Sequence, residues 1–89
     1  MINIIVPVYN EARHIAENIA SIKLTMLKFS NSQIIVVDDG STDKTYDLLR
    51  AVKDIILLRH KINLGKGAAI RTGLERTQGE YILFLSTEI

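Results

Sequence analysis

Two adjacent carboxylates stand at the end of an apolar run in this sequence, where the run Ile34–Val37 is followed by Asp38-Asp39-Gly40-Ser41. Side chains alternate along a strand, so Asp38 and Asp39 are expected on opposite faces. One carboxylate can then accept hydrogen bonds from a ligand in a crevice, while the other accepts backbone N–H groups near Ser41. The alternative is that both carboxylates only cap the turn and the helix that follows.

The segment Gly65-Lys66-Gly67 is a second candidate because it opens a predicted helix, where backbone N–H groups and a lysine can meet an anion. It is not a Walker A loop, since His60 and Gly67 replace the first glycine and the hydroxyl residue of that motif. It is not a dinucleotide fingerprint, since Ile70 replaces a glycine and the segment follows the third predicted strand. An anion site and a plain helix start both remain open.

Four further side chains are of types that can take part in binding or catalysis. The Tyr9 ring could stack on a base or pack beneath a loop. His14 and His60 each lack a second histidine at the sequence spacing typical of metal ligands, so neither is assigned a role. His14 is expected on the exposed side of a helix. Arg71 is expected to be solvated.

The elements that must position these residues follow from the hydrophobic pattern. Short apolar runs predict buried strands, and apolar spacings of three and four predict helices. The predicted strands are Ile2–Val8, Ile34–Val37, Ile55–Leu58 and Tyr81–Leu85, and the predicted helices are Glu11–Phe29, Asp43–Val52 and Gly67–Thr77, capped by Gly79. This βαβαβαβ order with short connections predicts an α/β fold with a parallel sheet.

Polar residues follow every predicted strand. In an open parallel sheet the binding crevice lies beyond the carboxyl ends of the strands. The candidates there are Tyr9, Asn10, Glu11, Asp38, Asp39, Asn63, Lys66, Ser86, Thr87 and Glu88. A response-regulator receiver is excluded, because its acidic pair would follow the first strand.

Size and charge exclude several classes of protein. Eighty-nine residues suit a single domain, 1–89, and the net charge of +1 gives no basic face for nucleic acid. The absence of cysteine excludes disulfides and thiolate chemistry. No apolar run reaches the length of a membrane span and the start has no basic n-region, so we expect a cytoplasmic protein.

Four segments in this order carry a family resemblance. They are Val6-Pro7-Val8-Tyr9-Asn10-Glu11, Val36-Val37-Asp38-Asp39-Gly40-Ser41-Thr42-Asp43, Asn63-Leu64-Gly65-Lys66-Gly67-Ala68-Ala69 and Gly79-Glu80-Tyr81-Ile82-Leu83-Phe84-Leu85. Together they resemble the family 2 glycosyltransferases of GT-A fold. The resemblance is greatest to the branch that loads mannose or glucose onto polyprenyl or dolichyl phosphate.

The resemblance implies a Rossmann-like nucleotide-binding half with strand order 3-2-1-4. It places Pro7, Tyr9 and Glu11 in a nucleotide pocket, assigns Asp39 to the base, and puts Lys66 near the base or the diphosphate. The ligand implied is a nucleoside diphosphate sugar. A protein that loads sugar onto polyprenyl phosphate would also lie peripheral to a membrane.

One departure from the family concerns the metal motif. Where the family has Asp-Xaa-Asp to hold Mg²⁺ or Mn²⁺ against the diphosphate, this chain has Ser86-Thr87-Glu88. Glu88 is the predicted metal ligand, and Ser86 is predicted to support the ribose or a bound water. We expect weakened metal affinity, and the alternative is that Glu88 is a surface residue.

A second departure is length, because the family's catalytic unit is more than twice as long and supplies the acceptor site and general base after the metal motif. No catalytic residue is therefore assigned. The expected function is a glycosyltransferase domain that binds a nucleoside diphosphate sugar and, in a complete enzyme, transfers the sugar to a lipid phosphate or saccharide. The alternative is a truncated or degenerate, non-catalytic nucleotide-binding module. An uncovered edge at the fourth strand predicts self-association.

Overall fold

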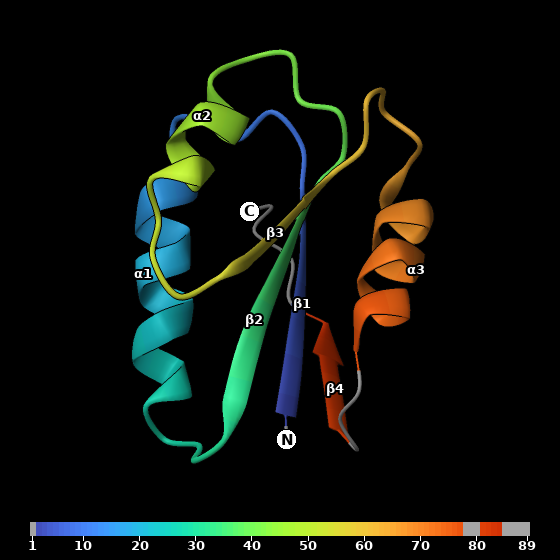
Figure 1. The fold of residues 1–89 in the computed structure, drawn as a ribbon. Coiled ribbons are helices and arrows are strands. Elements are labelled where there is room, and N and C mark those ends of the chain that lie inside the picture. The colour runs from blue at the N-terminus through green and yellow to red at the C-terminus, as the bar shows by residue number, and fades with distance from the viewer. Residues whose placement is uncertain (1, 78–80, 85–89) are drawn as a thin grey trace.

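The computed structural model describes residues 2–77 and the backbone of residues 81–84, and strands alternate with helices along the chain (Figure 1). The strands are β1 (Ile2–Val8), β2 (Ser32–Asp38), β3 (Ile56–Arg59) and β4 (Tyr81–Phe84), and the helices are α1 (Ile15–Met26), α2 (Thr45–Arg50) and α3 (Lys66–Arg76). The predicted α/β class is confirmed. The predicted cap at Gly79 and the predicted strand end at Leu85 lie outside the described residues.

The described strands form one parallel sheet in the order β3-β2-β1-β4. β1 and β2 pair from Ile2 opposite Ser32 to Val8 opposite Asp38. The pairing continues one step further, because the Asp39 N–H donates to the Val8 carbonyl at 2.8 Å. Tyr9 and Asp39 therefore leave the sheet side by side at its carboxyl edge.

The two faces of the sheet bury different residues against different helices. α1 and α2 cover one face and α3 covers the other (Figure 1). Ile34 and Val36 of β2 pack in a cluster with α1 and α2, whereas Ile35 and Val37 pack against Ala69 of α3. Burying each of these isoleucine or valine side chains stabilises the fold by about 1.5–3 kcal/mol. This alternation sends Asp38 and Asp39 to opposite faces.

The helices begin and end within a few residues of the predicted positions, with one clear difference at α1. The prediction began this helix at Glu11 and ended it at Phe29, but it runs from Ile15 to Met26. Residues 12–14 form turns that lead into α1, and the N–H group before them is bound from outside: Glu11 N donates to Thr45 Oγ1 at 2.9 Å. The loop before α2 thus satisfies an N–H group that precedes the helix.

No helix within the described part of the chain has both the length and the apolar composition needed to cross a membrane.

Candidate functional site

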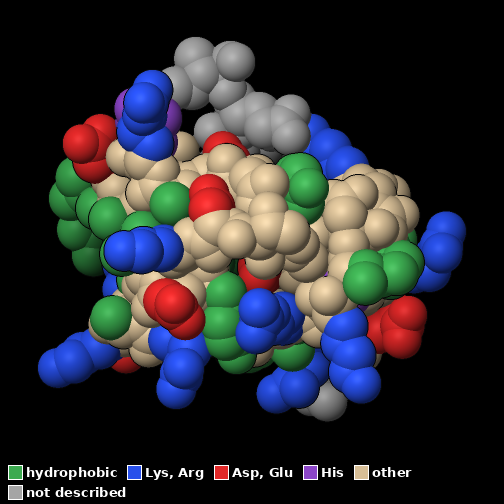
Figure 2. Space-filling view, turned by 90° about the horizontal axis from the view of Figure 1, so that it is seen from above, with side chains coloured by type: hydrophobic (Ala, Val, Ile, Leu, Met, Phe, Trp, Pro, Cys, Tyr) green, Lys and Arg blue, Asp and Glu red, His purple; other side chains and the backbone are tan. Residues whose placement is uncertain are grey.

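A cavity of about 240 Å³ opens where β1 and β2 end and α3 begins. Figure 2 views the molecule from this end, and Lys and Arg side chains project around the outline of the molecule. We call the cavity the strand-end pocket, and it is lined by Pro7, Val8, Tyr9, Asp39, Asn63, Gly65 and Lys66. Small molecules bind open parallel sheets in this position, so the pocket is the candidate site.

Asp39 forms one wall of the pocket and holds the loop between β3 and α3. Its Oδ1 accepts hydrogen bonds from Leu64 N at 2.9 Å and His60 Nδ1 at 2.8 Å. Its Oδ2 accepts hydrogen bonds from Gly65 N at 2.9 Å and Asn63 Nδ2 at 3.1 Å. A carboxylate offers about four lone-pair positions, so these donors fill its capacity. The residue that was predicted only to face a ligand is also a structural anchor.

Gly40 allows this loop to lie directly against the turn after β2. Its φ is +73°, and a Cβ at this position would lie 2.2 Å from the carbonyl carbon of Ile62 and 2.4 Å from the amide nitrogen of Asn63. No residue with a side chain fits there unless the backbone of the loop moves. Gly40 thus makes possible the close approach that brings four donors to Asp39.

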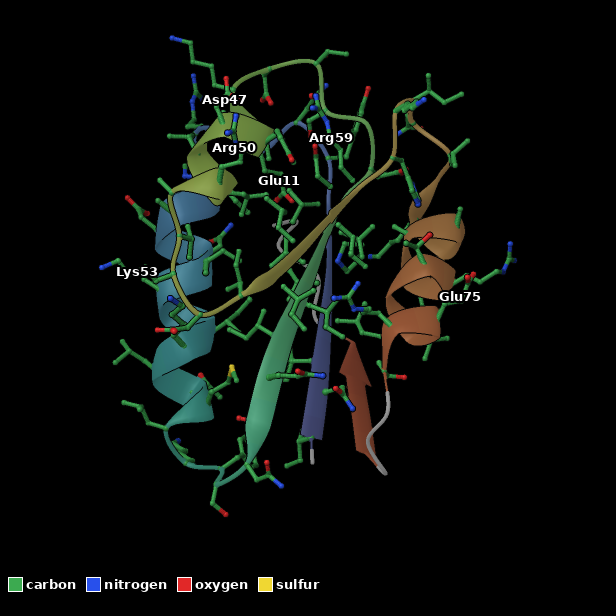
Figure 3. The ribbon with its side chains drawn as sticks, viewed as in Figure 1. Glu11, Asp47, Arg50, Lys53, Arg59 and Glu75 are labelled. Atoms are coloured by element: carbon green, nitrogen blue, oxygen red, sulfur yellow. The ribbon has the colours of Figure 1, made fainter. Side chains whose placement is uncertain are left out.

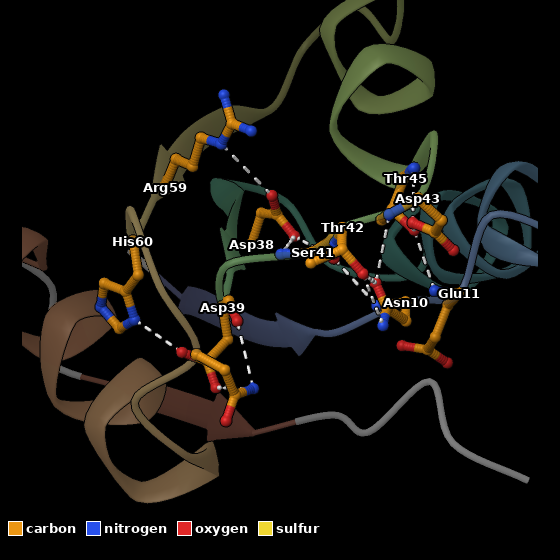
Figure 4. Close-up of polar contacts among 11 residues, drawn as sticks. Asn10, Glu11, Asp38, Asp39, Ser41, Thr42, Asp43, Thr45, Arg59 and His60 are labelled. Carbon is orange, nitrogen blue, oxygen red and sulfur yellow. Dashed lines mark hydrogen bonds and ion pairs between the residues drawn. The ribbon is translucent and has the colours of Figure 1, made fainter.

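Asp38 lies on the opposite face and is fully buried. Its Oδ1 accepts hydrogen bonds from Ser41 Oγ at 2.5 Å and Ser41 N at 3.4 Å, as the sequence predicted (Figure 4). Its Oδ2 lies 3.8 Å from Arg59 Nε and forms no hydrogen bond within the described residues. The Arg59 guanidinium also lies 4.0 Å from the centre of the Tyr46 ring. Asp38 therefore holds the turn and the end of β3, away from the pocket.

The loops after β1 and β2 are bonded to each other through side chains. Asn10, with φ of 49°, accepts a hydrogen bond from Thr42 N at 2.8 Å on its Oδ1 and donates its own N–H to Ser41 Oγ at 2.8 Å. The Thr45 hydroxyl, which accepts the Glu11 N–H, donates to Asp43 Oδ1 at 2.5 Å. These contacts fix where the chain leaves β1.

The Asp43 carboxyl has a pKa that departs from its ordinary value. Partial burial raises the pKa of this carboxyl, but the Thr45 hydroxyl and the N–H groups of Thr45 and Ala12 lower it by more. The net result is a pKa below the ordinary 3.8. The ionised carboxylate is thus the form that the loop binds.

The structure brings four of the predicted nucleotide residues together. Pro7, Tyr9, Asp39 and Lys66 all line the strand-end pocket. The ring of Tyr9 is not buried beneath a loop, because the residue is 41% exposed. Glu11 is not among the lining residues; it lies before α1 (Figure 3), beside Asp43 and Thr45 (Figure 4). Its assignment to a nucleotide pocket stays a prediction.

His60 is the site residue that the sequence interpretation missed. Its ring is nearly buried and joins Asp39 to Thr72 of α3, with Nε2 at 2.7 Å from Thr72 Oγ1. The histidine was dismissed because it has no ligand-spaced partner in the sequence. It does directly follow a strand, and that rule selected the other candidates and could have selected this one as well.

The predicted metal ligand Glu88 and its neighbour Ser86 lie outside the described residues. Among the residues that are described, no group of three His, Asp or Glu side chains could hold a metal ion. Asp39 is the carboxylate that lines the pocket, and both of its oxygens are already engaged by the loop. A cation at this site would therefore need ligands beyond the described part.

Comparison with known proteins gives a consistent family. A family model for glycosyl transferase family 2 matches residues 3–87. An uncharacterized glycosyltransferase of Haemophilus influenzae is 36% identical over 92 residues, covering 99% of this chain and 36% of that protein. The dolichyl-phosphate beta-glucosyltransferase ALG5A of Trichomonas vaginalis is 32% identical, over 98% of this chain and 30% of its own length. The chain thus spans about a third of these relatives.

Two solved structures share the fold. S. aureus TarS 1-349 in complex with UDP has a TM-score of 0.84 and 28% identity, over 97% of this chain and 27% of that chain. The mannosyltransferase PcManGT from Pyrobaculum calidifontis, in complex with GDP-Man and Mn²⁺, has a TM-score of 0.82 and 29% identity, over 96% of this chain and 26% of that chain.

Proposed function

The chain belongs to glycosyl transferase family 2, a family of transferase enzymes, and from that premise we propose that the strand-end pocket binds the nucleotide part of a nucleoside diphosphate sugar. One observation carries the proposal: Tyr9, Asp39 and Lys66, which come from three separate elements, line one cavity at the carboxyl edge of the sheet. The UDP complex of TarS and the GDP-Man complex of PcManGT support it, because both proteins share this fold.

The chemistry of the pocket suggests how a base would bind. A carboxylate only accepts hydrogen bonds, so Asp39 suits a base edge that presents N–H donors, as uracil and guanine do. Because the loop fills all four acceptor positions of Asp39, one donor must leave. The Asn63 amide is the candidate, since Asn63 is exposed and its side chain can rotate, whereas the donors from Leu64 and Gly65 are backbone N–H groups. The Tyr9 ring would stack on the base.

The diphosphate would lie at the start of α3. Lys66 is exposed at the first position of this helix, so its ammonium group and the positive end of the helix dipole would act on the same anion. Gly65 N is already bonded to Asp39, so the lysine would carry most of the attraction.

We propose further that Glu88 provides one carboxylate to a Mg²⁺ or Mn²⁺ ion that also binds the diphosphate. One or two protein carboxylates with phosphate oxygens are enough for Mg²⁺. The cation would neutralise charge that builds on the leaving nucleotide during transfer. The Mn²⁺ in the PcManGT complex supports a divalent ion in this family, and Ser86, which replaces a carboxylate, would weaken its binding here.

The acceptor that we propose is a lipid phosphate, with a saccharide as the alternative. The name of the Trichomonas relative, a dolichyl-phosphate beta-glucosyltransferase, supports the lipid phosphate. Such an acceptor also fits the expected location, cytoplasmic and peripheral to a membrane.

Calorimetric titration of the 89-residue chain with UDP, GDP, UDP-glucose and GDP-mannose, with and without Mn²⁺, tests the binding proposal. We expect saturable binding of at least one nucleotide, weakened about 10-fold by Lys66→Ala, because a charge-assisted contact to phosphate is lost. Lys61→Ala is the matched control, since Lys61 is an exposed lysine of the same loop that does not line the pocket. No heat with any of these ligands would overturn the proposal.

Transfer of a labelled sugar to polyprenyl phosphate separates a transferase from a non-catalytic nucleotide-binding module. Transfer by the chain would support the enzyme and contradict the module. Saturable nucleotide binding without transfer is expected both of the module and of a nucleotide-binding part that lacks its acceptor site, so the same assay on a protein that spans the full length of the relatives decides between them.

A further inference from the structure

His60 is placed where it can control the geometry of the pocket. It follows β3, and its backbone N–H donates to the Asp38 carbonyl at 2.9 Å. Its side chain is 9% exposed, with Nδ1 at 2.8 Å from Asp39 Oδ1 and Nε2 at 2.7 Å from Thr72 Oγ1. One imidazole therefore joins the pocket carboxylate to α3, the helix whose first residue, Lys66, also lines the pocket.

The contacts determine which nitrogen carries the proton. Each oxygen of Asp39 already accepts a backbone N–H, one from Leu64 and one from Gly65, so the carboxylate is an acceptor toward the imidazole. His60 Nδ1 must then be the donor. In the neutral ring Nε2 is left as an acceptor, and the Thr72 hydroxyl donates to it. The surroundings thus select the Nδ1–H tautomer, whereas an unconstrained imidazole in water favours Nε2–H.

Without the imidazole, Asp39 would keep three of its four donors but lose the only one that comes from a buried side chain. Two of the remaining donors belong to the backbone of the same loop, and the third is the exposed Asn63 amide. The contact between Thr72 and Asp39 would also be lost, because within the described residues it runs through the ring. Oδ2 would keep Gly65 N and Asn63 Nδ2, but Oδ1 would be held by the Leu64 N–H alone, so the carboxylate would be less firmly fixed.

We propose that His60 is a positioning residue for nucleotide binding: it fixes the Asp39 carboxylate and ties the loop of residues 60–65 to α3. The inference rests on the proposed function of the pocket and adds a residue that the family resemblance did not assign. His60 itself does not line the pocket, so it acts on the ligand through Asp39.

Two amide variants of His60 test the contribution of each ring nitrogen separately. The amide nitrogen of asparagine is bonded to Cγ, as Nδ1 is, so His60→Asn keeps a donor for Asp39. The amide nitrogen of glutamine lies one bond further out, near the position of Nε2, so His60→Gln loses that donor. We expect His60→Gln and His60→Ala to weaken UDP or GDP binding about 10-fold, and His60→Asn to stay within about 3-fold of wild type.

Thr72→Val tests the link to α3. It keeps the shape of the side chain but removes the hydroxyl that donates to Nε2, so we expect a loss in affinity of about 3-fold. Thr77→Val is the matched control at the end of the same helix, because the Thr77 hydroxyl bonds only the Leu74 carbonyl in the described structure. All variants are compared at temperatures where circular dichroism shows them fully folded.

The ring itself gives an independent readout in the wild-type chain. Long-range ¹H–¹⁵N correlation spectra should show a proton on Nδ1 of His60, and the ring nitrogen signals should shift when UDP or GDP is added. An Nε2–H tautomer would overturn the inference even if the alanine variant failed to fold. Wild-type binding that His60→Gln leaves unchanged would overturn it too, with the proposed function intact. A wild-type chain that binds no nucleotide would overturn the proposed function as well.

Discussion

Asp38 and Asp39 are neighbours in the chain, yet they belong to two regions with different surroundings. Asp38 belongs to a closed network on the α1 and α2 face, where Ser41 and Arg59 contact it, and it does not line the strand-end pocket. Asp39 lies on the α3 face at the wall of the strand-end pocket. Strand alternation places two identical side chains in different surroundings, one in a network of side chains and one at the candidate site.

Both regions depend on Gly40, so Gly40→Ala should have the largest effect. The new Cβ would meet the backbone of Ile62 at 2.2 Å, and φ of +73° is unfavourable for alanine. We expect a loss of about 3 kcal/mol in the free energy of unfolding, measured in urea, together with loss of nucleotide binding. Gly67→Ala is the control, because a Cβ there meets nothing within 4 Å. Equal effects of the two substitutions would contradict the close approach.

Replacing each of the two carboxylates by an amide should lower stability in both cases, but only the change at Asp39 should strongly weaken nucleotide binding. Asp39→Asn places an NH₂ group against the donors of the loop, so we expect a loss of about 2 kcal/mol in stability and at least 10-fold in nucleotide affinity. Asp38→Asn should cost about 1–2 kcal/mol but leave affinity within about 3-fold. Urea unfolding and calorimetry measure both quantities. If Asp38→Asn weakens binding as much as Asp39→Asn, the separation of the two regions is wrong.

The Asn63 side chain is the contact of Asp39 that a ligand could displace, whereas Asp38 does not line the strand-end pocket. If a base replaces the Asn63 amide at Oδ2, then Asn63→Ala removes a competitor, and UDP or GDP should bind about 2- to 3-fold more tightly. Lys66→Ala, which removes an attraction instead, should act in the opposite direction. A 10-fold loss of affinity in Asn63→Ala would show that the amide binds the ligand or is essential to the loop.

The smallest effect is expected in the closed network, at Asp43. Its folded pKa lies below the ordinary 3.8, so the ionised carboxylate contributes stability that is fully present above that value and is lost as pH falls through the folded pKa. Wild type should therefore melt at a higher temperature than Asp43→Asn at pH 7, and the difference should shrink below about pH 4. A difference in Tm that stays constant from pH 7 to pH 3 would show that the carboxylate charge is not responsible.

The fold was predictable because every buried strand is a short apolar run. The side chains of Ile34–Val37 are buried alternately on the two faces of the sheet. Such a continuous apolar run predicts a central strand even when its neighbouring strands are unknown. Helix starts were harder to predict, since the N–H groups before α1 bond to Thr45 and Asp43, which lie more than thirty residues away along the chain. A local sequence pattern does not show such contacts between distant parts of the chain.

The site was predictable to the extent that it follows strand ends. Tyr9, Asp39 and Lys66 were selected by this rule and by resemblance, and the structure places them around one cavity. The role of Asp39 in holding the loop was missed, because its donors are backbone groups of Leu64 and Gly65 that a sequence does not mark. His60 was missed for a similar reason, since its partner Thr72 becomes a neighbour only when α3 packs on the sheet.

The most direct test of the central claim is a two-dimensional ¹H–¹⁵N NMR titration of the chain with UDP and GDP. We expect the shifted backbone amides to cluster at the strand-end pocket, at Tyr9, Asp39, Gly65 and Lys66. A second cavity, lined by residues such as Lys23, Met26 and Gln33, serves as the internal control and should stay unchanged. Shifts confined to that second cavity, or no shifts with either nucleotide, would contradict the account.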